Sequence, residues 1–387
     1  MNGAATGALD IQRLHEALDL AAQSVGLSDP NPRVGCIVGN AAGDVFGRGF
    51  TQEAGGPHAE VVALREAASS GADLHGATAW VTLEPCAHQG RTPPCTEALI
   101  GAGLGRVVVA VGDPFPQVAG AGITRLRAAG IQVDLAGESI AQAARELNIG
   151  FFSRFERGRP WVRLKVAVSL DGRVALADGS SQWLTGEAAR RDAHAWRRRA
   201  GAIVTGVGTV IADDPRLDVR LVPTRVQPLR LVLDPRLRTP AAARVLMPPG
   251  RTCLVHAADA APAEAPPWPD SVDRWALPRS DLGLDLPRLL AGLAERQVNE
   301  LHLEGGPRLN AAWLGQGLVD ELLVYLAPCL VGPGLPLAEL PALGRLADSP
   351  RFSPVDVLAL GNDLRWRLRP QVSNELTDSS TEPGDGV

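Results

Sequence analysis

Thr82-Leu83-Glu84-Pro85-Cys86-Ala87-His88-Gln89-Gly90-Arg91-Thr92-Pro93-Pro94-Cys95 is the most informative stretch of this 387-residue sequence. It follows an apolar segment, residues 77–83, that predicts a buried strand, and Pro94 stands in the first turn of a predicted helix. Upstream, His58-Ala59-Glu60 opens another predicted helix. One histidine and two cysteines at the ends of such elements are typical of a catalytic zinc site, which takes three protein ligands and leaves one position open.

The spacing of the cysteines departs from the general signature of zinc deaminases, H-x-E followed by P-C-x-x-C. Eight residues separate Cys86 from Cys95, and Gln89, which is no zinc ligand, stands where the second cysteine is expected. In such sites zinc lowers the pKa of bound water, and a carboxylate two residues after the histidine moves a proton to the leaving amine. The alternative interpretation is a buried Cys86 thiol beside an ordinary loop.

The whole stretch from Thr82 to Cys95 resembles the zinc motif of the riboflavin-pathway deaminases, whose second cysteine is delayed in the same way. Asn31-Pro32-Arg33-Val34-Gly35 and Gly56-Pro57-His58-Ala59-Glu60 are similar to further motifs of that family. The resemblance implies that His58, Cys86 and Cys95 bind Zn²⁺, that Glu60 is the catalytic proton shuttle and that Asn31 contacts the pyrimidine. For Arg91, a phosphate contact and a solvated loop arginine both stay open. His88 takes no ligand role, and Cys36 is expected in the core.

Residues 1–155 alternate between helical and strand-like patterns. Helices are predicted over residues 10–25, 58–68, 94–102, 121–129 and 139–152, and strands over residues 34–38, 45–50, 77–83, 106–111 and 131–135. This order predicts an α/β/α sandwich, of the cytidine-deaminase type by resemblance. Residues 154–160, rich in Gly, Pro and Arg, are the expected linker to a second domain over residues 156–370, and residues 371–387 read as a disordered tail.

Four stretches of the second half resemble the reductase part of the bifunctional riboflavin enzymes, which has a dihydrofolate-reductase-like α/β fold. They are Leu164-Lys165-Val166-Ala167-Val168-Ser169-Leu170-Asp171-Gly172-Arg173, Ser181-Gln182-Trp183-Leu184-Thr185, Gly208-Thr209-Val210-Ile211-Ala212-Asp213-Asp214-Pro215 and Glu304-Gly305-Gly306-Pro307. From the residues alone, Gly305-Gly306-Pro307 joins a strand to a helix, where free N–H groups attract phosphate. An ordinary tight turn is the alternative.

The resemblance also implies the ligands of the second site. NADPH contacts are expected at Ala167, Trp183, Thr209, Asp213, Gly306, Pro307, Arg308 and Leu309, and substrate contacts at Ser181, Arg197, Leu217, Arg220 and Glu304. Pro235 replaces a serine that the family uses for its cofactor. The implied activity is zinc-hydroxide deamination of diaminohydroxyphosphoribosylaminopyrimidine, followed by NADPH hydride reduction of the ribosyl side chain to ribityl. The protein then mainly positions the reactants.

Lys165 is the only lysine in the chain, where Lys and Arg together number 38. Its strand alternates, with Val162, Leu164, Val166 and Val168 on the face expected to pack into the core. We hypothesise that Lys165, beside Ala167 on the other face, contacts the substrate through its compact ammonium. The alternative is a lysine that remains by chance on a solvent-exposed strand face and has no role in binding. For the arginines of residues 190–199 we expect a solvated basic face, except at Arg197, and for His194, His302, Cys253 and Cys329 structural roles.

Composition restricts the remaining classes of protein. Five cysteines, an odd number, indicate reduced thiols or metal ligands in a cytoplasmic enzyme, and no apolar run or leader suggests a membrane or secretion. The acidic first half and an aromatic content of 4% oppose the rival nucleic-acid-editing deaminase, which needs a basic groove with aromatics. A degenerate scaffold would have lost ligands, yet all are present. We expect a small phosphorylated pyrimidine as partner, no nucleic acid, and a homodimer through the second domain by resemblance.

Overall fold

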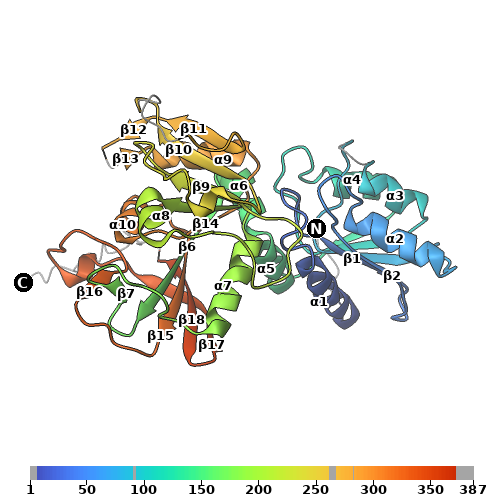
Figure 1. Cartoon of the computed structure of the whole chain (residues 1–387). Coiled ribbons are helices and arrows are strands. Elements are labelled where there is room, and N and C mark those ends of the chain that lie inside the picture. Colours follow the sequence, from blue (N-terminus) through green and yellow to red (C-terminus); the bar gives the residue numbers. More distant parts are fainter. Residues whose placement is uncertain (1–6, 90–92, 261–266, 282, 372–387) are drawn as a thin grey trace, which may run out of the picture.

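The first part of the chain forms a five-stranded sheet with helices on both faces in the computed structural model (Figure 1). Its strands are β1 (Gly35–Gly39), β2 (Val45–Phe50), β3 (Thr78–Val81), β4 (Arg106–Val109) and β5 (Gln132–Leu135), in the order β2-β1-β3-β4-β5. Strand β1 is antiparallel to β2 and β3, whereas β3, β4 and β5 are parallel. The structure describes residues 7–89, 93–260, 267–281 and 283–371, so Arg91 and the predicted tail lie outside the described residues, except for Gln371.

Successive side chains of these strands point to opposite faces, and each face has its own apolar layer. On one face α1 (Ala8–Ala22) and α5 (Glu138–Leu147) pack on Ile37, Trp80 and Val108. On the other, α2 (Ala59–Ser69), α3 (Cys95–Gly101) and α4 (Ala121–Ala128) pack on Cys36, Val38, Ala79, Val81, Val107 and Val109. The predicted α/β/α sandwich is therefore confirmed, and Cys36 is a core residue as expected.

The prediction of one helix over residues 139–152 is wrong. Helix α5 ends at Leu147, and α6 (Ile149–Arg157) begins after Asn148. The buried Asn148 side chain accepts a hydrogen bond from the Arg33 backbone N–H at 2.7 Å and donates one to the Arg33 carbonyl at 2.9 Å. Hydrogen bonds from a side chain to a distant backbone segment compete with the helix, so the helix ends here. The local sequence pattern gives no sign of this break.

The two domains are joined through α6. This helix runs to Arg157, Gly158 with φ 67° ends it, and β6 (Trp161–Ser169) starts the second sheet. The expected boundary between residues 155 and 156 therefore falls in the last turn of α6, and only the second half of the expected linker is a connection. A left-handed residue after a helix is a common stop, and glycine adopts it without strain.

A nine-stranded mixed sheet forms the centre of the second domain, in the order β11-β10-β9-β8-β14-β6-β15-β18-β17. The strands after β6 are β7 (Arg173–Leu176), β8 (Ala202–Gly206), β9 (Leu229–Leu233), β10 (Thr252–Ala257), β11 (Val272–Leu277), β12 (Arg279–Ser280), β13 (Gly283–Leu284), β14 (Glu300–Leu303), β15 (Glu321–Ala327), β16 (Gly334–Pro336), β17 (Phe352–Leu360) and β18 (Asp363–Pro370). From β11 to β15 neighbouring strands are parallel, and β18 and β17 add an antiparallel edge. Two small pairs, β12 with β13 and β7 with β16, stand apart.

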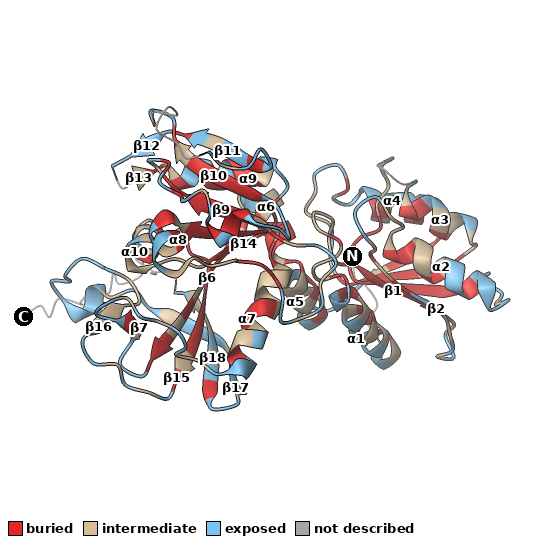
Figure 2. Cartoon of the chain, viewed as in Figure 1, coloured by how far each residue is buried: buried red, intermediate tan, exposed pale blue. Residues whose placement is uncertain are grey.

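Helices cover both faces of this sheet. Helices α9 (Leu286–Glu295) and α10 (Pro307–Gly315) pack on the face that holds Val162, Leu164, Val166 and Val168, which are all buried as predicted. Helices α7 (Glu187–Arg199) and α8 (Val207–Asp213) cover the opposite face. Figure 2 shows the inner strands of both sheets largely buried, whereas the edge strands β17 and β18 are mostly not, and the buried centre confirms an α/β domain of the expected class. In the described parts of the chain, no helix combines the length and apolar character that crossing a membrane requires.

Candidate active sites

The three predicted metal ligands of the first domain lie together. His58 is the residue before α2, Cys86 lies in the loop after β3, and Cys95 begins α3. His58 Nδ1 lies 3.1 Å from Cys95 Sγ and 3.6 Å from Cys86 Sγ, and all three ligand atoms lie within 4.8 Å of one another. This spacing fits a single zinc ion, which binds nitrogen at ~2.0 Å and sulfur at ~2.3 Å.

The protonation of the two thiols also fits a divalent metal. The hydrogen bond with Cys95 lowers the pKa of Cys86 to about 4, and the same contact raises the pKa of Cys95. The Cys95 backbone N–H adds a contact to Cys86 Sγ at 3.4 Å. The pair therefore shares one proton at neutral pH. A metal ion that binds both sulfurs displaces that proton, so a pair already carrying one negative charge is a suitable donor set.

Glu60 lies in the first turn of α2, two residues after His58, and is buried. Burial, followed by the negative charge of Cys86, raises the pKa of Glu60. This carboxyl therefore takes up a proton more readily than an exposed one. Such a group suits a general base that must also act as an acid in the next step, as the predicted proton shuttle requires.

Glu84, which the sequence analysis did not single out, holds the loop that carries Cys86. Its buried carboxylate accepts hydrogen bonds from the backbone N–H groups of Gly120 at 3.0 Å, Ile123 at 3.1 Å and Asp113 at 3.3 Å. These bonds join the end of β3 to the start of α4. An acidic residue at the end of a long apolar strand was the signal that could have identified it.

Asn31, the predicted pyrimidine contact, is half-buried in the connection between α1 and β1. Its backbone N–H donates to the Ser28 carbonyl at 2.8 Å, and Ser28 Oγ donates to the Asn31 carbonyl at 3.2 Å. The side chain is thus presented by a short, locally bonded loop. His88 packs its ring edge-on against Phe115, with centroids 5.7 Å apart, and does not belong to the ligand cluster.

In the second domain, several predicted NADPH contacts gather at the carboxyl ends of parallel strands. Thr209 lies in the first turn of α8, directly after β8, and Gly306 precedes α10 after β14, the neighbouring strand. A Cβ placed on Gly306 would lie 3.6 Å from Thr209 Oγ1, and one on Gly206 would lie 3.4 Å from Leu309. Nucleotides commonly bind at this edge of a parallel sheet, next to the free N–H groups of a helix start.

The other predicted NADPH contacts are more dispersed. Pro307 and Arg308 open α10, and Arg308 pairs with Glu339 on the surface at 3.2 Å. Asp213 ends α8, and Ala167 lies on β6 beneath α7. Trp183 lies on the loop before α7, 66% exposed, with the Arg190 guanidinium 4.9 Å from its ring. An exposed ring held by a cation is available to stack on a ligand.

The predicted substrate contacts of this domain centre on an ion pair between α7 and β14. Arg197 donates to both carboxylate oxygens of Glu304, at 2.5 and 2.9 Å. Burial alone would raise the pKa of Glu304, but Arg197 and then Lys165 outweigh it and hold that pKa well below its usual range. Lys165 is half-buried between Glu304 and the ring of Tyr325, which lies 5.8 Å from its Nζ. Burial lowers the pKa of Lys165, and the nearby Glu304 carboxylate opposes that shift.

The loop after α8 brings the remaining predicted substrate residues close. Arg197 Nη1 donates to the Asp218 carbonyl at 3.1 Å, and Arg220 Nη1 donates to the Asp218 carboxylate at 2.5 Å. His194, expected to be structural, is buried and accepts the Arg220 backbone N–H at 3.2 Å. Leu217 is buried in an apolar cluster, so only its backbone is free to meet a ligand. Ser181 is half-exposed on the loop before α7.

The expected solvated basic face of α7 is wrong for Arg199. Arg191 is exposed and pairs only with Glu187 on the same helix, as expected. Arg199 instead donates to the Glu300 carboxylate at 2.8 Å and to the Leu147 carbonyl at 2.8 Å. The cause is the first domain, which covers the end of α7. A helix pattern cannot reveal a cover that comes from residues far away in the sequence.

Comparisons with known proteins identify both domains of the chain. Residues 9–111 match the model of the cytidine and deoxycytidylate deaminase zinc-binding region, and residues 160–365 match that of the RibD C-terminal domain. The chain is 43% identical over 365 residues to the riboflavin biosynthesis protein RibD of Escherichia coli, with 91% of this chain and 97% of the relative covered. It is 41% identical over 357 residues to the RibD protein of Aquifex aeolicus, with 92% and 97% covered.

Solved structures give the same result. The chain superposes on Acinetobacter baumannii RibD with a TM-score of 0.84 and 39% identity, covering 94% of this chain and 99% of that one. On a diaminohydroxyphosphoribosylaminopyrimidine deaminase/5-amino-6-(5-phosphoribosylamino)uracil reductase from Thermotoga maritima it has a TM-score of 0.85 and 32% identity, over 94% and 99%. Together with the His–Cys–Cys cluster, these matches show that the chain belongs to the RibD family of riboflavin biosynthesis enzymes, bifunctional proteins in which a zinc-dependent deaminase is joined to an NADPH-dependent reductase.

Proposed function

We propose that the first domain deaminates diaminohydroxyphosphoribosylaminopyrimidine and that the second reduces the ribosyl side chain of the product to ribityl with NADPH. The similarity to the Thermotoga maritima enzyme, a diaminohydroxyphosphoribosylaminopyrimidine deaminase and 5-amino-6-(5-phosphoribosylamino)uracil reductase, supports this substrate. The single observation that carries the proposal is the cluster of His58, Cys86 and Cys95 with the buried Glu60 beside it. We propose residues 1–155 and 156–370 as the two functional domains.

In the deaminase we propose that His58, Cys86 and Cys95 hold zinc, and that Asn31 orients the ring. Zinc bound there supplies a Lewis acid that lowers the pKa of water towards neutrality. Glu60 accepts the proton of the water whose oxygen bonds to the amino-bearing ring carbon. It then passes that proton to the amine, the C–N bond breaks, and ammonia leaves. The raised pKa of Glu60 suits both directions of transfer.

In the reductase we propose that Gly306, Pro307, Arg308 and Leu309 receive the cofactor phosphates, with Ala167, Trp183, Thr209 and Asp213 as further contacts. NADPH supplies a hydride to the ribose carbon, which is activated in its ring-opened imine form. Lys165, Arg197 and Glu304 form the charged group that faces the sugar, with Ser181, Leu217 and Arg220 around it. Their task is to position the acceptor carbon against the cofactor.

We also propose that the enzyme is cytoplasmic, binds no nucleic acid and forms a homodimer through its second domain. Strand β17 is a free edge of the large sheet, and Val357, Leu364 and Trp366 on β17 and β18 are exposed. An apolar edge of this kind is suited to a second copy of the chain. Light scattering on the full chain should then give twice the chain mass, and a single-chain mass would contradict the dimer.

Metal analysis combined with an ammonia-release assay tests the main proposal. The purified chain should contain about one zinc and release ammonia from the pyrimidine without NADPH, and NADPH oxidation should follow only on the deaminated product. Cys95→Ser should lose zinc and ammonia release together, because a missing thiolate removes one of three ligands. Full zinc content in Cys95→Ser would show that the ligand set is wrong. Ammonia release from single-stranded nucleic acid would instead support the editing deaminase.

A further inference from the structure

The loop that carries Asn31 rests on the reductase domain. Asn299, directly before β14, is buried, and its side-chain NH₂ donates to Asp29 Oδ1 at 3.2 Å and to the Pro30 carbonyl at 3.0 Å. Both acceptors belong to the deaminase domain and lie within two residues of Asn31. We call residues 26–33 the pyrimidine loop. Asn299 is thus a reductase-domain residue whose side-chain NH₂ donates both of these hydrogen bonds to a loop of the other domain.

Arg33 ends the pyrimidine loop and is buried in the same contact. It donates to Glu300 Oε1 at 2.6 Å and to the Arg199 carbonyl at 2.9 Å, both in the reductase domain. Its other side-chain partners are Leu147 O at 3.0 Å and Asp29 Oδ2 at 3.4 Å. A guanidinium with four acceptors has a single orientation, so the end of the loop is held from both domains.

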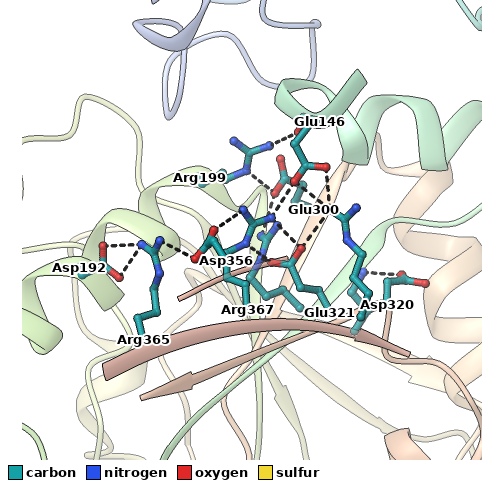
Figure 3. A network of polar contacts seen from close by, with 12 residues as sticks. Glu146, Asp192, Arg199, Glu300, Asp320, Glu321, Asp356, Arg365 and Arg367 are labelled. Atoms are coloured by element: carbon teal, nitrogen blue, oxygen red, sulfur yellow. Dashed lines mark hydrogen bonds and ion pairs between the residues drawn. The ribbon is translucent and has the colours of Figure 1, made fainter. Parts of the chain in front are cut away.

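Glu300 is held in turn by two arginines of its own domain. Its carboxylate accepts from Arg163 at 2.9 Å and from Arg199 at 2.8 Å, and Figure 3 shows the Glu300 carboxylate beside Arg199. Burial alone would raise the pKa of Glu300, but Arg199, Arg33 and Arg163 together lower it. The carboxylate is therefore held in its charged form among three arginines, of which Arg33 comes from the other domain.

The backbones at this contact leave no room for adjustment. A Cβ on Gly26, at the start of the pyrimidine loop, would lie 2.4 Å from Arg198 Cγ. A Cβ on Gly150, on α6, would lie 2.4 Å from Glu300 Cγ and 2.5 Å from the Asn299 carbonyl. Glycines at such distances allow two chain segments to approach as closely as their backbones permit. The start of the loop and helix α6 are consequently both packed closely on the reductase domain.

We infer that Asn299 and Glu300 of the reductase domain are positioning residues for deamination: they hold the pyrimidine loop so that Asn31 meets the ring. The inference rests on the proposed function of Asn31. The loop leads directly into β1, where Cys36 packs in the same buried cluster as Ala59, the residue between His58 and Glu60. The loop thus borders the deaminase site, and its position is set by residues that belong to the other enzyme.

The test uses the full chain with Asn299→Ala. Losing two hydrogen bonds to the loop should raise the KM of ammonia release roughly tenfold, with kcat within about twofold, because binding through Asn31 is weakened before any chemistry. Zinc content and NADPH oxidation should equal those of the wild type. Hydrogen exchange of residues 28–33 should become faster, which measures the loop without any substrate.

Glu146→Gln is the matched control. Glu146 lies at the same domain contact, on its deaminase side, and it pairs with Arg367 and Arg369 at 2.7 Å but not with the pyrimidine loop (Figure 3). Its KM should remain that of the wild type. The inference is overturned if Asn299→Ala leaves KM and exchange unchanged, or if Glu146→Gln raises KM equally. Absence of ammonia release in the wild type would instead refute the proposed function, and the exchange experiment would still decide on the loop.

Discussion

At the scale of single residues, the deaminase site separates metal binding from proton transfer. His58, Cys86 and Cys95 supply the ligand atoms, while Glu60, in the first turn of α2, stands outside that cluster. The two functions therefore depend on different side chains, although they are close in space. Substitutions at these positions should have different consequences, and the difference is measurable.

Glu60→Gln is predicted to keep zinc and lose turnover. The amide has the shape of the carboxyl but cannot accept and return a proton, so kcat should fall by at least ~10²–10⁴-fold. Zinc content should stay at about one per chain, measured by elemental analysis on the same sample. Near-normal ammonia release by this variant would show that another group moves the proton.

Lys165→Arg is predicted to impair the reductase alone. Lys165 lies between Glu304 and Tyr325. A guanidinium is planar and larger than the lysine ammonium, so an arginine at this position would place its charge differently. NADPH oxidation should fall strongly, roughly a hundredfold, with ammonia release and the thermal midpoint near those of the wild type. Arg191→Lys is the control, because it also exchanges arginine and lysine in this domain but at an exposed position. It should leave NADPH oxidation unchanged. Unimpaired NADPH oxidation in Lys165→Arg would refute its role.

At the scale of elements, the zinc loop depends on the helix that packs on it. Gly122 lies in α4, and a Cβ there would be 1.9 Å from the carbonyl oxygen of Pro85, next to Cys86. Glu84 bonds the same helix start, so α4 and the zinc loop form one unit. No substitution at Gly122 leaves this unit undisturbed, because both clashing groups belong to the backbone.

Gly122→Ala is therefore predicted to shift the zinc loop. Zinc affinity should fall at least tenfold, measured by competition with a chelator, and the thermal midpoint should fall with it. Gly101→Ala in α3 is the control, since a Cβ there meets nothing within 4 Å and alanine favours the helix by ~1 kcal/mol. Equal zinc affinities in the two variants would contradict the packing argument.

Helix α7 shows how an element can combine two sites. Its inner face covers a polar face of the large sheet, where Trp196 is surrounded by the guanidinium groups of Arg163, Arg199, Arg365 and Arg367 at 4.3–6.0 Å from the ring centre. Arginine stacks well on indole, so these cations pack as a core layer. Arg197 on the same helix reaches the reductase site and Arg199 reaches the domain contact.

At the scale of the whole molecule, buried carboxylates and arginines join the two domains, and they should make stability depend on pH. Burial alone would raise the pKa of Glu321, but Arg163 and Arg367 outweigh it and lower that pKa to about 2. A carboxylate with a lowered folded pKa contributes stability above its unfolded pKa of ~4.3 and loses it as the pH falls towards 2. The contribution is about 3 kcal/mol at neutral pH.

The thermal midpoint is accordingly predicted to fall between pH 5 and pH 3. Glu321→Gln should lower the midpoint at pH 7, because two buried arginines lose a charged partner. The gap between wild type and variant should then shrink as the pH is lowered through this window. A gap of constant size from pH 7 to pH 3 would show that Glu321 does not hold its charge through this ion pair.

Much of this molecule could be predicted from local pattern. His58, Cys86, Cys95 and Glu60 stand at the starts of helices or after a strand, a local pattern that indicates a zinc site. Their individual roles came from the resemblance to a known family, because the spacing of the cysteines alone left a buried Cys86 thiol open. The alternation of β6 predicted its buried face, and the glycines before α10 predicted a nucleotide-binding turn. These features depend on strand and helix periodicity, which neighbouring residues determine.

Only the tertiary structure showed how the two domains meet. Arg33 and Glu300 are 267 positions apart, and Asn299 and Asp29 are 270 apart, so no window of sequence contains both partners. The same holds for Asn148, where a helix ends because the side chain bonds the backbone of Arg33, which is distant in the sequence. It also holds for Arg199, which is covered by the first domain, and the pattern of its own helix gives no sign of that contact. Periodicity along the chain indicates which face of an element is apolar. The partner of a buried charge depends instead on how whole elements pack against one another, and that packing exists only in the folded chain.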